Sequence, residues 1–484
     1  MPAHPHRSHR PCDQRRPQCR WPLRAVRRHG RGRPYLGARL GTPSPRPGRV
    51  WGRDPVKATV TLEVTEGAQR GRRFVFHERS ACIVGRAADC SPRVPDDSDH
   101  RTISRHHCLL DINPPDIRVR DFGSRNGTYV NGVKIGQREA GQAPEDADHR
   151  HFPEHDLRTG DEIAFGPTVL RVHIDAPGPG TPGPVLESSD PGEVVRRLID
   201  KAAVGEPALA ALADYRLERE LGRGGMGAVF LARHKVTGTP IAVKAMLPKV
   251  AAGDRARERF LREAEVSRRL RHPHIASLYD LGSDGRTFFF TLEYCSGGSV
   301  HEFVTGLGRP LTVQEALPIA FQVLDGLGHA HRHGVVHRDL TPHNILLHPG
   351  PPGEAPVAKV SDFGLAKSFD QAGLSGLTRT GSAMGKPYFM SRQQVVNFKY
   401  SKPDVDVWAL AACLYWMLTG AYPRDFPPGK DLWQVVLQDA PIPVRERTPA
   451  VPERLAETLD QALRDRPAIG FTTASDLRHA LERT

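Results

Sequence analysis

The sequence predicts two folded domains joined by a linker: a β-sandwich, followed by a larger α+β domain. Three observations predict this order. Short alternating strands with turn residues fill residues 58–174, proline and glycine dominate residues 176–184, and helical periods follow the strands that begin at residue 215. A chain of 484 residues has room for two or three domains that each bury a core.

The N-terminal segment, residues 1–56, carries most of the basic charge. It holds 14 arginines, no lysine and two aspartates, whereas the whole chain has a net charge of +13. The segment lacks an apolar period, so we expect it to be disordered or to be a translated leader upstream of the true start. Nucleic-acid binding through this tail is the weaker alternative.

Eight short strands separated by turns such as Asn126-Gly127 predict the first domain. A polar, acidic insertion at residues 141–156 interrupts them. We expect a solvated loop there, and a divalent-metal site formed by its histidines and carboxylates is the alternative. The expected strands span residues 59–64, 73–76, 81–84, 108–112, 117–120, 128–130, 162–164 and 168–174.

Composition argues against a membrane protein. The longest apolar stretch, residues 407–418, is too short to span a bilayer and follows Asp406. Seven widely spaced cysteines with no CxxC pair indicate reduced thiols, and we expect a cytoplasmic location. Residues 175–214 are expected to be a linker with a short amphipathic segment at 194–203.

The second domain begins with a glycine-rich turn, LGRGGMGAVF, which contains Gly222, Gly224 and Gly227. Glycines let backbone amides approach phosphate oxygens closely. A dinucleotide-binding turn would continue into a helix, whereas a second strand follows here and ends at Lys244. We expect Lys244 to lie under the turn and to pair with Glu263 on a helix predicted over residues 254–270.

Two further motifs follow in order. His337-Arg338-Asp339 is followed five residues later by Asn344, and Asp362-Phe363-Gly364 begins 23 residues after Asp339. Phosphoryl transfer requires a carboxylate that orients the acceptor hydroxyl and oxygen ligands for Mg²⁺. The ordered set predicts transfer of a phosphoryl group from a metal-bound nucleotide.

With these motifs, residues 215–484 resemble the eukaryotic-type (Hanks-type) protein kinases. The resemblance implies a bilobal α+β fold, ATP and Mg²⁺ as cofactors, and protein serine or threonine side chains as acceptors. It also implies that the apolar stretch after Asp406 is a buried helix. The implied nucleotide-binding residues are Leu221, Gly222, Gly224, Gly227, Val229, Lys244, Glu263, Glu293 and Cys295; Asp339 is the implied catalytic base, and Asn344 and Asp362 the implied metal ligands.

The chain departs from this family at two places. Thr341 stands where its serine/threonine members place lysine, and Lys386 stands where they place threonine, so we hypothesise that the two residues have exchanged roles. The family's APE motif is Ser391-Arg392-Gln393 here, and its arginine partner falls at Gly470. Loss of both partners indicates a compensated fold with a looser activation segment. A catalytically weak pseudokinase that acts as a phosphopeptide-binding scaffold is the alternative.

Arg338 next to the catalytic base is typical of kinases that are switched on by phosphorylation, since its guanidinium needs an anionic partner. Thr378 and Thr380 are the expected phosphorylation sites.

Three loop motifs of the first domain predict an anion site: Gly85-Arg86, Ser104-Arg105-His106-His107 and Ser124-Arg125-Asn126-Gly127. With them, residues 58–174 resemble the forkhead-associated (FHA) domain, which binds phosphothreonine peptides. The resemblance implies that Arg86 and Ser104 hold the phosphate, while His107 braces their loop. Arg105 and Arg125 would support the phosphate and the peptide backbone, and Asn126 would hydrogen-bond the peptide. The expected peptides are phosphorylated substrates or the chain's own activation segment, in cis or by self-association.

Overall fold

The computed structural model describes residues 58–77, 80–88, 90–139, 153–175, 190–224, 227–246, 254–284, 287–350, 356–363, 387–396, 401–427, 430 and 432–484; for residues 254–257 and 259 it describes the backbone alone. The predictions for residues 1–56, for the linker at 176–184 and for Thr378, Thr380 and Lys386 concern residues outside these ranges.

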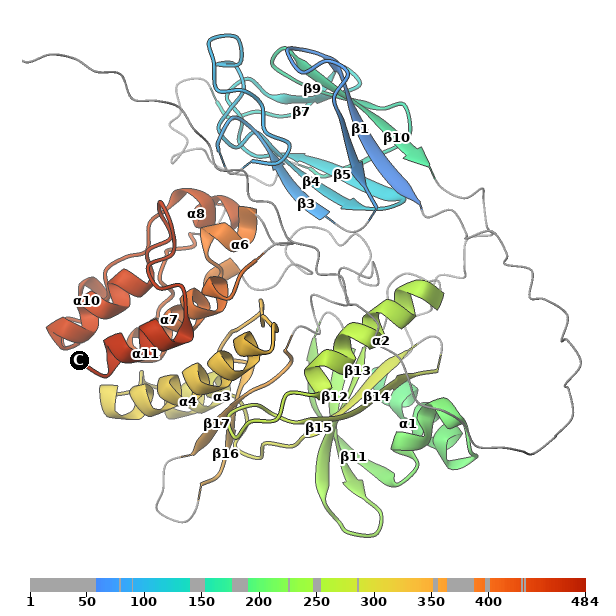
Figure 1. Ribbon diagram of the computed structural model, residues 1–484, viewed down its shortest axis with the longest axis vertical. Helices are drawn as coiled ribbons and strands as arrows, with labels where there is room; N and C mark the ends of the chain where they lie inside the picture. The colour runs from blue at the N-terminus through green and yellow to red at the C-terminus, as the bar shows by residue number, and fades with distance from the viewer. Residues whose placement is uncertain are drawn as a thin grey trace, which may run out of the picture. The chain divides into compact units, whose positions relative to one another are not determined.

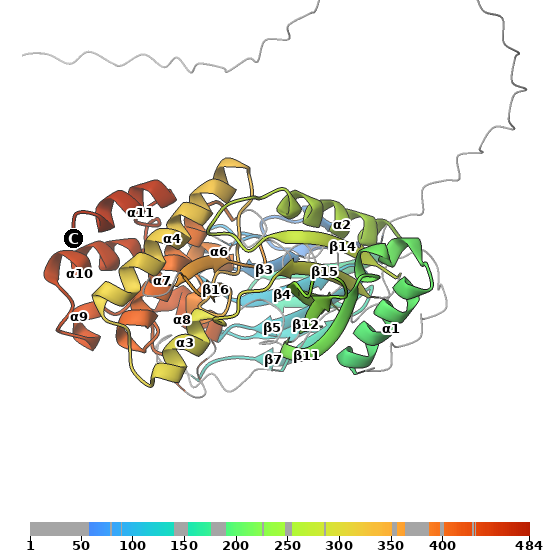
Figure 2. The same ribbon diagram turned by 90° about the horizontal axis from the view of Figure 1, so that it is seen from below.

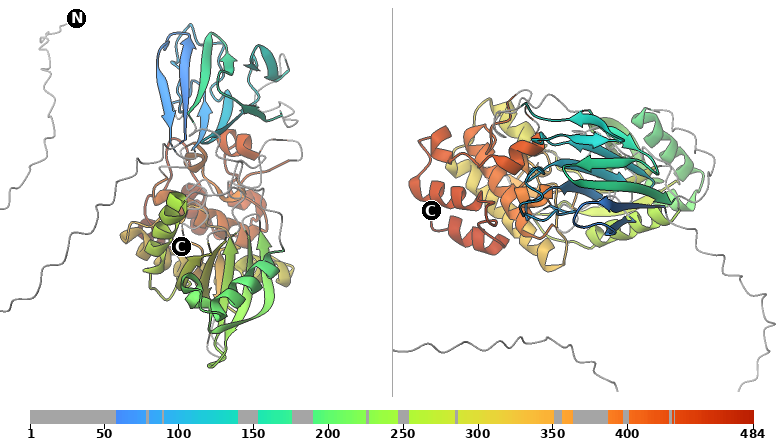
Figure 3. Two further views of the ribbon diagram at one scale, coloured as in Figure 1. Left: turned by 90° about the vertical axis from the view of Figure 1, so that its right-hand side faces the viewer. Right: turned by 90° about the horizontal axis from the view of Figure 1, so that it is seen from above.

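The first domain is a sandwich of two antiparallel sheets (Figures 1 and 3). One sheet has the strand order β2-β1-β10-β9-β6-β7 and the other β3-β4-β5-β8. Buried and half-exposed positions alternate along β1, so Val60, Leu62 and Val64 face the core. The strands are β1 (Thr59–Glu66), β2 (Arg73–Phe76), β3 (Ser80–Val84), β4 (Cys108–Asn113), β5 (Asp116–Asp121), β6 (Thr128–Val130), β7 (Val133–Gly136), β8 (His155–Leu157), β9 (Glu162–Phe165) and β10 (Thr168–Asp175).

Two of these strands differ from the sequence prediction. β7 completes a hairpin with β6 around Asn131, which has a left-handed φ of 49°. β8 lies at the end of the predicted insertion and pairs with β5. The expectation of a solvated loop as far as residue 156 is therefore wrong at its C-terminal end. There Arg118 binds Glu154 at 3.0 Å and Asp156 at 2.6 Å, so these carboxylates have a cationic partner.

The segment before the second domain packs on that domain. Helix α1 (Pro191–Ala203) begins at Asp190, whose carboxylate accepts a hydrogen bond from the Glu193 amide. Its buried side chains, with those of the 3₁₀-helix η1 (Pro207–Leu212), join a cluster that includes Phe230, Val243 and Phe289 of the following sheet. The helix thus covers apolar surface on that sheet (Figure 1).

The second domain has two lobes. The small lobe is a five-stranded antiparallel sheet with the order β11-β12-β13-β15-β14 and one helix, α2 (Asp254–Arg268). Phe260 of α2 packs edge-on against Phe288 and Phe290 of the sheet. The strands are β11 (Tyr215–Gly224), β12 (Gly227–His234), β13 (Pro240–Met246), β14 (Leu278–Ser283) and β15 (Phe288–Glu293).

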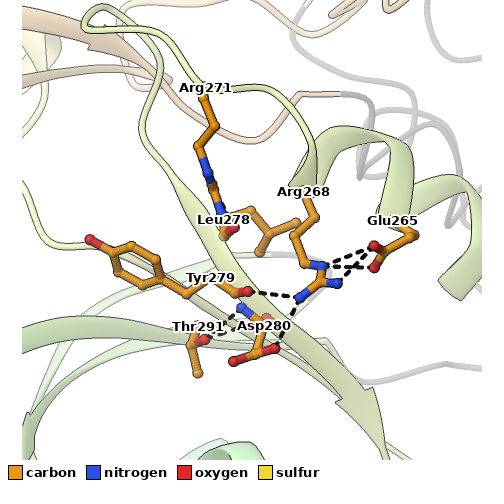
Figure 4. Close-up of polar contacts among 7 residues, drawn as sticks. All are labelled: Glu265, Arg268, Arg271, Leu278, Tyr279, Asp280 and Thr291. Atoms are coloured by element: carbon orange, nitrogen blue, oxygen red, sulfur yellow. Dashed lines mark hydrogen bonds and ion pairs between the residues drawn. The ribbon is translucent and has the colours of Figure 1, made fainter.

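Polar contacts anchor the C-terminal end of α2 to β14 (Figure 4). The guanidinium of Arg268 binds Glu265 on its own helix and donates to the Tyr279 carbonyl at 3.4 Å and to Asp280 at 3.3 Å. Arg271 donates to the Leu278 carbonyl at 3.1 Å. These contacts fix the helix that carries Glu263 relative to the sheet.

The large lobe is mostly helical, with α4 and α7 packed along each other (Figure 2). Almost every residue of α7 is buried, and Trp408 and Tyr415 are fully enclosed, so the apolar stretch forms the centre of this lobe. No helix in the described ranges is long and apolar enough to cross a membrane. The elements are α3 (Val300–Leu307), α4 (Val313–Arg332), β16 (Ile345–His348), β17 (Val357–Val360), η2 (Pro387–Phe389), α6 (Arg392–Val396), α7 (Asp404–Thr419), α8 (Leu432–Gln438), α9 (Val444–Arg447), α10 (Glu453–Ala462) and α11 (Ala474–Leu481).

Candidate active site and phosphopeptide site

The glycine-rich sequence includes the C-terminal end of β11 and the start of β12, which pair with each other in the small-lobe sheet. Gly227 is the glycine that the fold itself requires: its φ is 152°, and a Cβ there would lie 1.9 Å from the Ala245 carbonyl oxygen. A Cβ on Gly222 or Gly224 would meet no protein atom within 4 Å. These two glycines therefore leave space beside the turn that packing does not use.

Lys244 lies on β13 opposite Val229 of β12, the strand that follows the glycine-rich turn. Its ammonium binds the Asp362 carboxylate, with Nζ 2.7 Å from Oδ2, across 118 residues of sequence. The predicted Lys244–Glu263 ion pair is not formed between these described side chains. Burial lowers the pKa of Arg338, and the charges of Asp406 and Glu263 oppose this shift.

The loop that follows His337 brings Asp339 and Asn344 together. The side-chain amide of Asn344 donates to the backbone carbonyl of Asp339 at 2.7 Å, and its nitrogen lies 3.4 Å from the Asp339 carboxylate. His337 accepts from the Asp339 amide through Nδ1, so its Nε2–H donates to the Ser361 carbonyl at 2.7 Å. This imidazole couples the loop to the residue before Asp362.

Asp406 holds the same loop in place, a role that the sequence analysis did not assign. Its carboxylate is fully buried and accepts from the backbone amides of His337 and Arg338 and from the His331 ring, at 2.7–2.8 Å. Burial raises the pKa of Asp406, but these hydrogen bonds and the neighbouring histidines outweigh it and hold the pKa below its ordinary value. An aspartate at the start of a long apolar helix was the signal available in the sequence.

Two of the implied nucleotide-binding residues join an apolar cluster. Leu221 and Val229 pack against a cluster that contains Ala242 and Leu292. The Glu293 carboxylate is bound by Lys359 at 3.1 Å and by the Ser277 amide at 3.1 Å. Burial raises the pKa of Cys295 to about 12, which keeps this thiol neutral.

In the sandwich, the three predicted loop motifs meet. Arg86 donates to the Ile103 carbonyl at 2.6 Å and pairs with Asp96. Ser104 accepts from the Arg125 amide at 3.0 Å, and the Asn126 side chain donates to the Thr102 carbonyl at 2.6 Å. Arg105 and Arg125 are exposed beside them. The geometry forms one cationic surface with a hydroxyl and an amide at its centre.

His107 braces these loops from inside the domain. Its Nδ1 accepts from the Ser104 amide at 3.0 Å, and its Nε2–H donates to the Gly127 carbonyl at 3.1 Å. Burial lowers the pKa of His107, partly opposed by the charge of Asp121. The neutral ring is therefore the form that this arrangement uses.

Asp121, in the Asp121-Phe122-Gly123 sequence that resembles a second metal-binding motif, has a structural role. Its carboxylate accepts from the Ser124 amide at 2.9 Å, from the Ser124 hydroxyl at 2.6 Å and from the Thr128 hydroxyl at 2.5 Å. These bonds shape the turn that carries Arg125 and Asn126.

Comparison with known families decides what this geometry belongs to. Residues 215–476, just over half of the chain, match the protein kinase domain. The chain belongs to the protein kinase family. Residues 82–166 match the FHA domain, so an FHA domain precedes the kinase domain.

Bacterial kinases are among the similar proteins. The serine/threonine-protein kinase PrkC of Bacillus subtilis is 32% identical over 264 residues, 54% of this chain and 39% of PrkC. The serine/threonine-protein kinase Pkn1 of Myxococcus xanthus is 32% identical over 319 residues, 65% of this chain and 43% of Pkn1. The solved kinase domain of Mycobacterium tuberculosis PknI is 28% identical, with 56% of this chain and 96% of that chain covered and a TM-score of 0.43. The chain spans less than half the length of PrkC and Pkn1.

Two positions at which the chain departs from the family's sequence pattern, Thr341 and Gly470, lie among the described residues. Thr341 is buried, and its backbone carbonyl accepts a hydrogen bond from the backbone N–H of Asn344 at 2.9 Å. Lys386 lies outside the described residues. A Cβ on Gly470 would lie 1.9 Å from the Gln461 carbonyl oxygen, so no arginine fits there. The position of the family's arginine partner is therefore closed by the backbone.

Proposed function

We propose that this chain transfers the γ-phosphoryl group of ATP to serine or threonine hydroxyls of proteins. The arrangement of Lys244, Asp339, Asn344 and Asp362 supports the proposal, because three separate segments meet here. Lys244 binds Asp362, Asn344 binds Asp339, and the Ser361 amide next to Asp362 donates to the Asn344 carbonyl at 2.9 Å. In the proposed step, Asp339 orients the acceptor hydroxyl and takes its proton. A bond forms between that oxygen and the γ-phosphorus, the bond to the bridging oxygen breaks, and ADP leaves.

The donor set fits Mg²⁺. Asp362 offers a carboxylate and Asn344 an amide oxygen, which are hard ligands, and Mg²⁺ in such sites takes one or two protein ligands and completes its shell with phosphate and water. The described residues contain no group of three or more histidine, cysteine, aspartate or glutamate side chains placed to hold a metal by themselves. When bound, the metal would neutralise charge on the phosphates. Lys244, now paired with Asp362, would turn its ammonium to the α- and β-phosphates.

The test is phosphate transfer from radiolabelled ATP with Mg²⁺ by the full chain and by Asp339→Asn. Label on protein with the wild type, and none above background with the variant, supports the proposal. Equal label in both supports the scaffold alternative, in which a kinase fold binds nucleotide without transfer. Phosphoamino-acid analysis of the product tests the serine/threonine preference, and a phosphotyrosine product contradicts it.

We infer that the FHA domain reads phosphothreonine. Arg86 supports this inference, because its half-buried guanidinium donates to the Ile103 carbonyl and, among the described residues, pairs with one carboxylate, Asp96. A phosphothreonine brings nearly two charges and three acceptor oxygens, so it competes well for this arginine and for Ser104. Binding of a labelled phosphothreonine peptide that Arg86→Ala abolishes is the expected result, and equal binding of the unphosphorylated peptide contradicts the inference.

We propose that Thr378 and Thr380 of this chain are phosphorylation sites and that, once phosphorylated, they bind the FHA domain. We also propose that the substrates are cytoplasmic proteins. Arg338 supports the proposed phosphorylation sites, because its guanidinium is largely buried and its Nε has no hydrogen-bond partner among the described residues. Mass spectrometry after incubation with ATP tests the sites. Phosphate confined to other residues contradicts the assignment.

A further inference from the structure

A buried ion pair lies beside residues 390–393, the part of the activation segment that holds Ser391-Arg392-Gln393 in place of the family's APE motif. Arg424, in the turn after α7, binds Asp465, in the turn after α10, and their side chains are 1% and 2% exposed. The family's glutamate–arginine pair is absent, since residue 393 is glutamine and Gly470 has no space for a side chain. This chain therefore keeps a buried pair in the region but builds it from different residues.

The pair binds the segment that replaces the APE motif. Asp465 accepts from the Arg392 amide at 2.9 Å through its carboxylate and from the Gln393 side chain at 2.7 Å through its carbonyl. Arg424 donates to the Met390 carbonyl at 3.3 Å. Residues 390, 392 and 393 are thus hydrogen-bonded to two residues of the large lobe, and Ser391 between them is buried.

The pair itself is rigidly held. The Arg424 guanidinium lies 5.0 Å from the centre of the Trp408 ring and donates to the Asp439 carbonyl at 2.9 Å. The Trp408 indole donates to the Leu463 carbonyl at 2.9 Å. A buried ion pair is stable only when its geometry is good and further hydrogen bonds satisfy both charged groups. These bonds therefore favour one arrangement of residues 390–393 against the large lobe.

The same segment, through Gln394, contacts the loop that carries Asp339. The buried Gln394 side chain donates to the Arg338 carbonyl at 2.6 Å, next to Asp339. Arg338 has a left-handed φ of 64°, which a non-glycine residue adopts only when its surroundings impose it. Asp406 holds the amide side of Arg338 at 2.7 Å, and Gln394 holds its carbonyl side.

We propose that Arg424 and Asp465 replace the family's ion pair as the anchor of the activation segment, and that Gln394 is a positioning residue that transmits this anchor to Asp339. The inference rests on the proposed kinase activity, because it assigns residues that orient the catalytic base. It replaces the expectation of a looser segment with a segment tied down by a different pair.

Gln394→Met tests the last contact, because it keeps the side-chain length and removes the donor. Turnover is normalised to the number of nucleotide-binding sites, so that partial unfolding does not count. We expect kcat to fall by about 10- to 100-fold while KM for ATP stays unchanged, because misplacement of a catalytic group affects the chemical step. Gln314→Met, the same change at an exposed position of α4, is the control and should keep wild-type turnover. Wild-type kcat in Gln394→Met overturns the positioning role.

The anchor is tested by Asp465→Asn and by the double variant Arg424→Met with Asp465→Leu. The double variant removes both charges, so it should melt at a higher temperature than Asp465→Asn, which leaves Arg424 without its charged partner. We expect its kcat to stay low nonetheless, because the Arg392 amide and Met390 carbonyl have lost their partners. If the double variant recovers kcat together with melting temperature, the pair is only structural and the proposal is overturned.

Hydrogen exchange gives a measurement that needs no activity. Amides of residues 390–396 should exchange faster in Asp465→Asn than in the wild type, whereas Asp460→Asn, the same change at a carboxylate that binds the Val444 amide, should leave them unchanged. Equal exchange in Asp465→Asn and wild type overturns the anchor. If wild type transfers no more phosphate than Asp339→Asn, the proposed function fails, while the exchange result still decides the anchor.

Discussion

Arg223, between Gly222 and Gly224 of the glycine-rich turn, binds Asp190, the residue that caps helix α1, with Nη2 2.9 Å from Oδ1. Arg223 also binds Glu220 at 2.9 Å. The hydrogen bond from Arg223 lowers the pKa of Asp190, so this carboxylate is charged at neutral pH. Helix α1 lies outside residues 215–476, which match the protein kinase domain. The ion pair connects this helix to the turn that would cover ATP.

Asp190→Asn should raise KM for ATP by about twofold to fivefold with little change in kcat, since the exposed pair is weak and steadies only the turn. Asparagine keeps the helix cap and removes the charge. Lys201→Gln is the matched control, because it breaks the 2.9 Å Lys201–Asp284 pair of the same helix away from the turn. The difference should disappear at high salt. An equal effect of both variants on KM would contradict a specific role of Asp190.

The three glycines should respond differently to alanine. Gly227→Ala places a methyl group against the Ala245 carbonyl at a backbone angle that alanine avoids, so we expect a loss of about 1–3 kcal/mol of folding free energy. Gly222→Ala and Gly224→Ala have space and should keep the melting temperature while they weaken ATP binding. Thermal melts with and without ATP measure both effects. Equal melting temperatures for all three variants would refute the distinction.

The stability of the FHA domain should depend on His107 as pH falls. Burial depresses the pKa of this ring, so the unfolded chain binds more protons than the native one between the native pKa and about 6.5. Stability therefore rises with pH through that window and is complete above it. Protonated Nδ1 cannot accept from the Ser104 amide, so phosphopeptide binding should weaken at the same time. His107→Gln does not titrate and should flatten the pH dependence of unfolding; an unchanged slope would contradict the role of His107.

The exchange between Thr341 and Lys386 remains a prediction. Thr341→Lys places a lysine at both position 341 and position 386, and Lys386→Thr leaves a threonine at both. We therefore expect each single variant to reduce activity. The double variant should recover activity if the two side chains act together. Losses that simply add in the double variant would rule out the exchange.

Strand prediction succeeded where the sequence alternates and failed where a strand depends on its partner. The apolar alternation of β1 is visible in the sequence because every second side chain enters the core. β8 contains the polar residues His155 and Asp156 and exists because β5 lies beside it. A three-residue strand has too little local signal to be assigned without that neighbour.

The order and spacing of Lys244, Asp339, Asn344 and Asp362 predict a site for phosphate chemistry, and the three loop motifs predict an anion site. Such motifs are local, because each depends on a few consecutive residues and a turn. Only the tertiary structure decided which charges meet: Lys244 binds Asp362 instead of Glu263, and Asp465 binds Arg424. An ion pair depends on distance in space, and many carboxylates in a sequence compete for each cation until the packed chain brings one of them within reach.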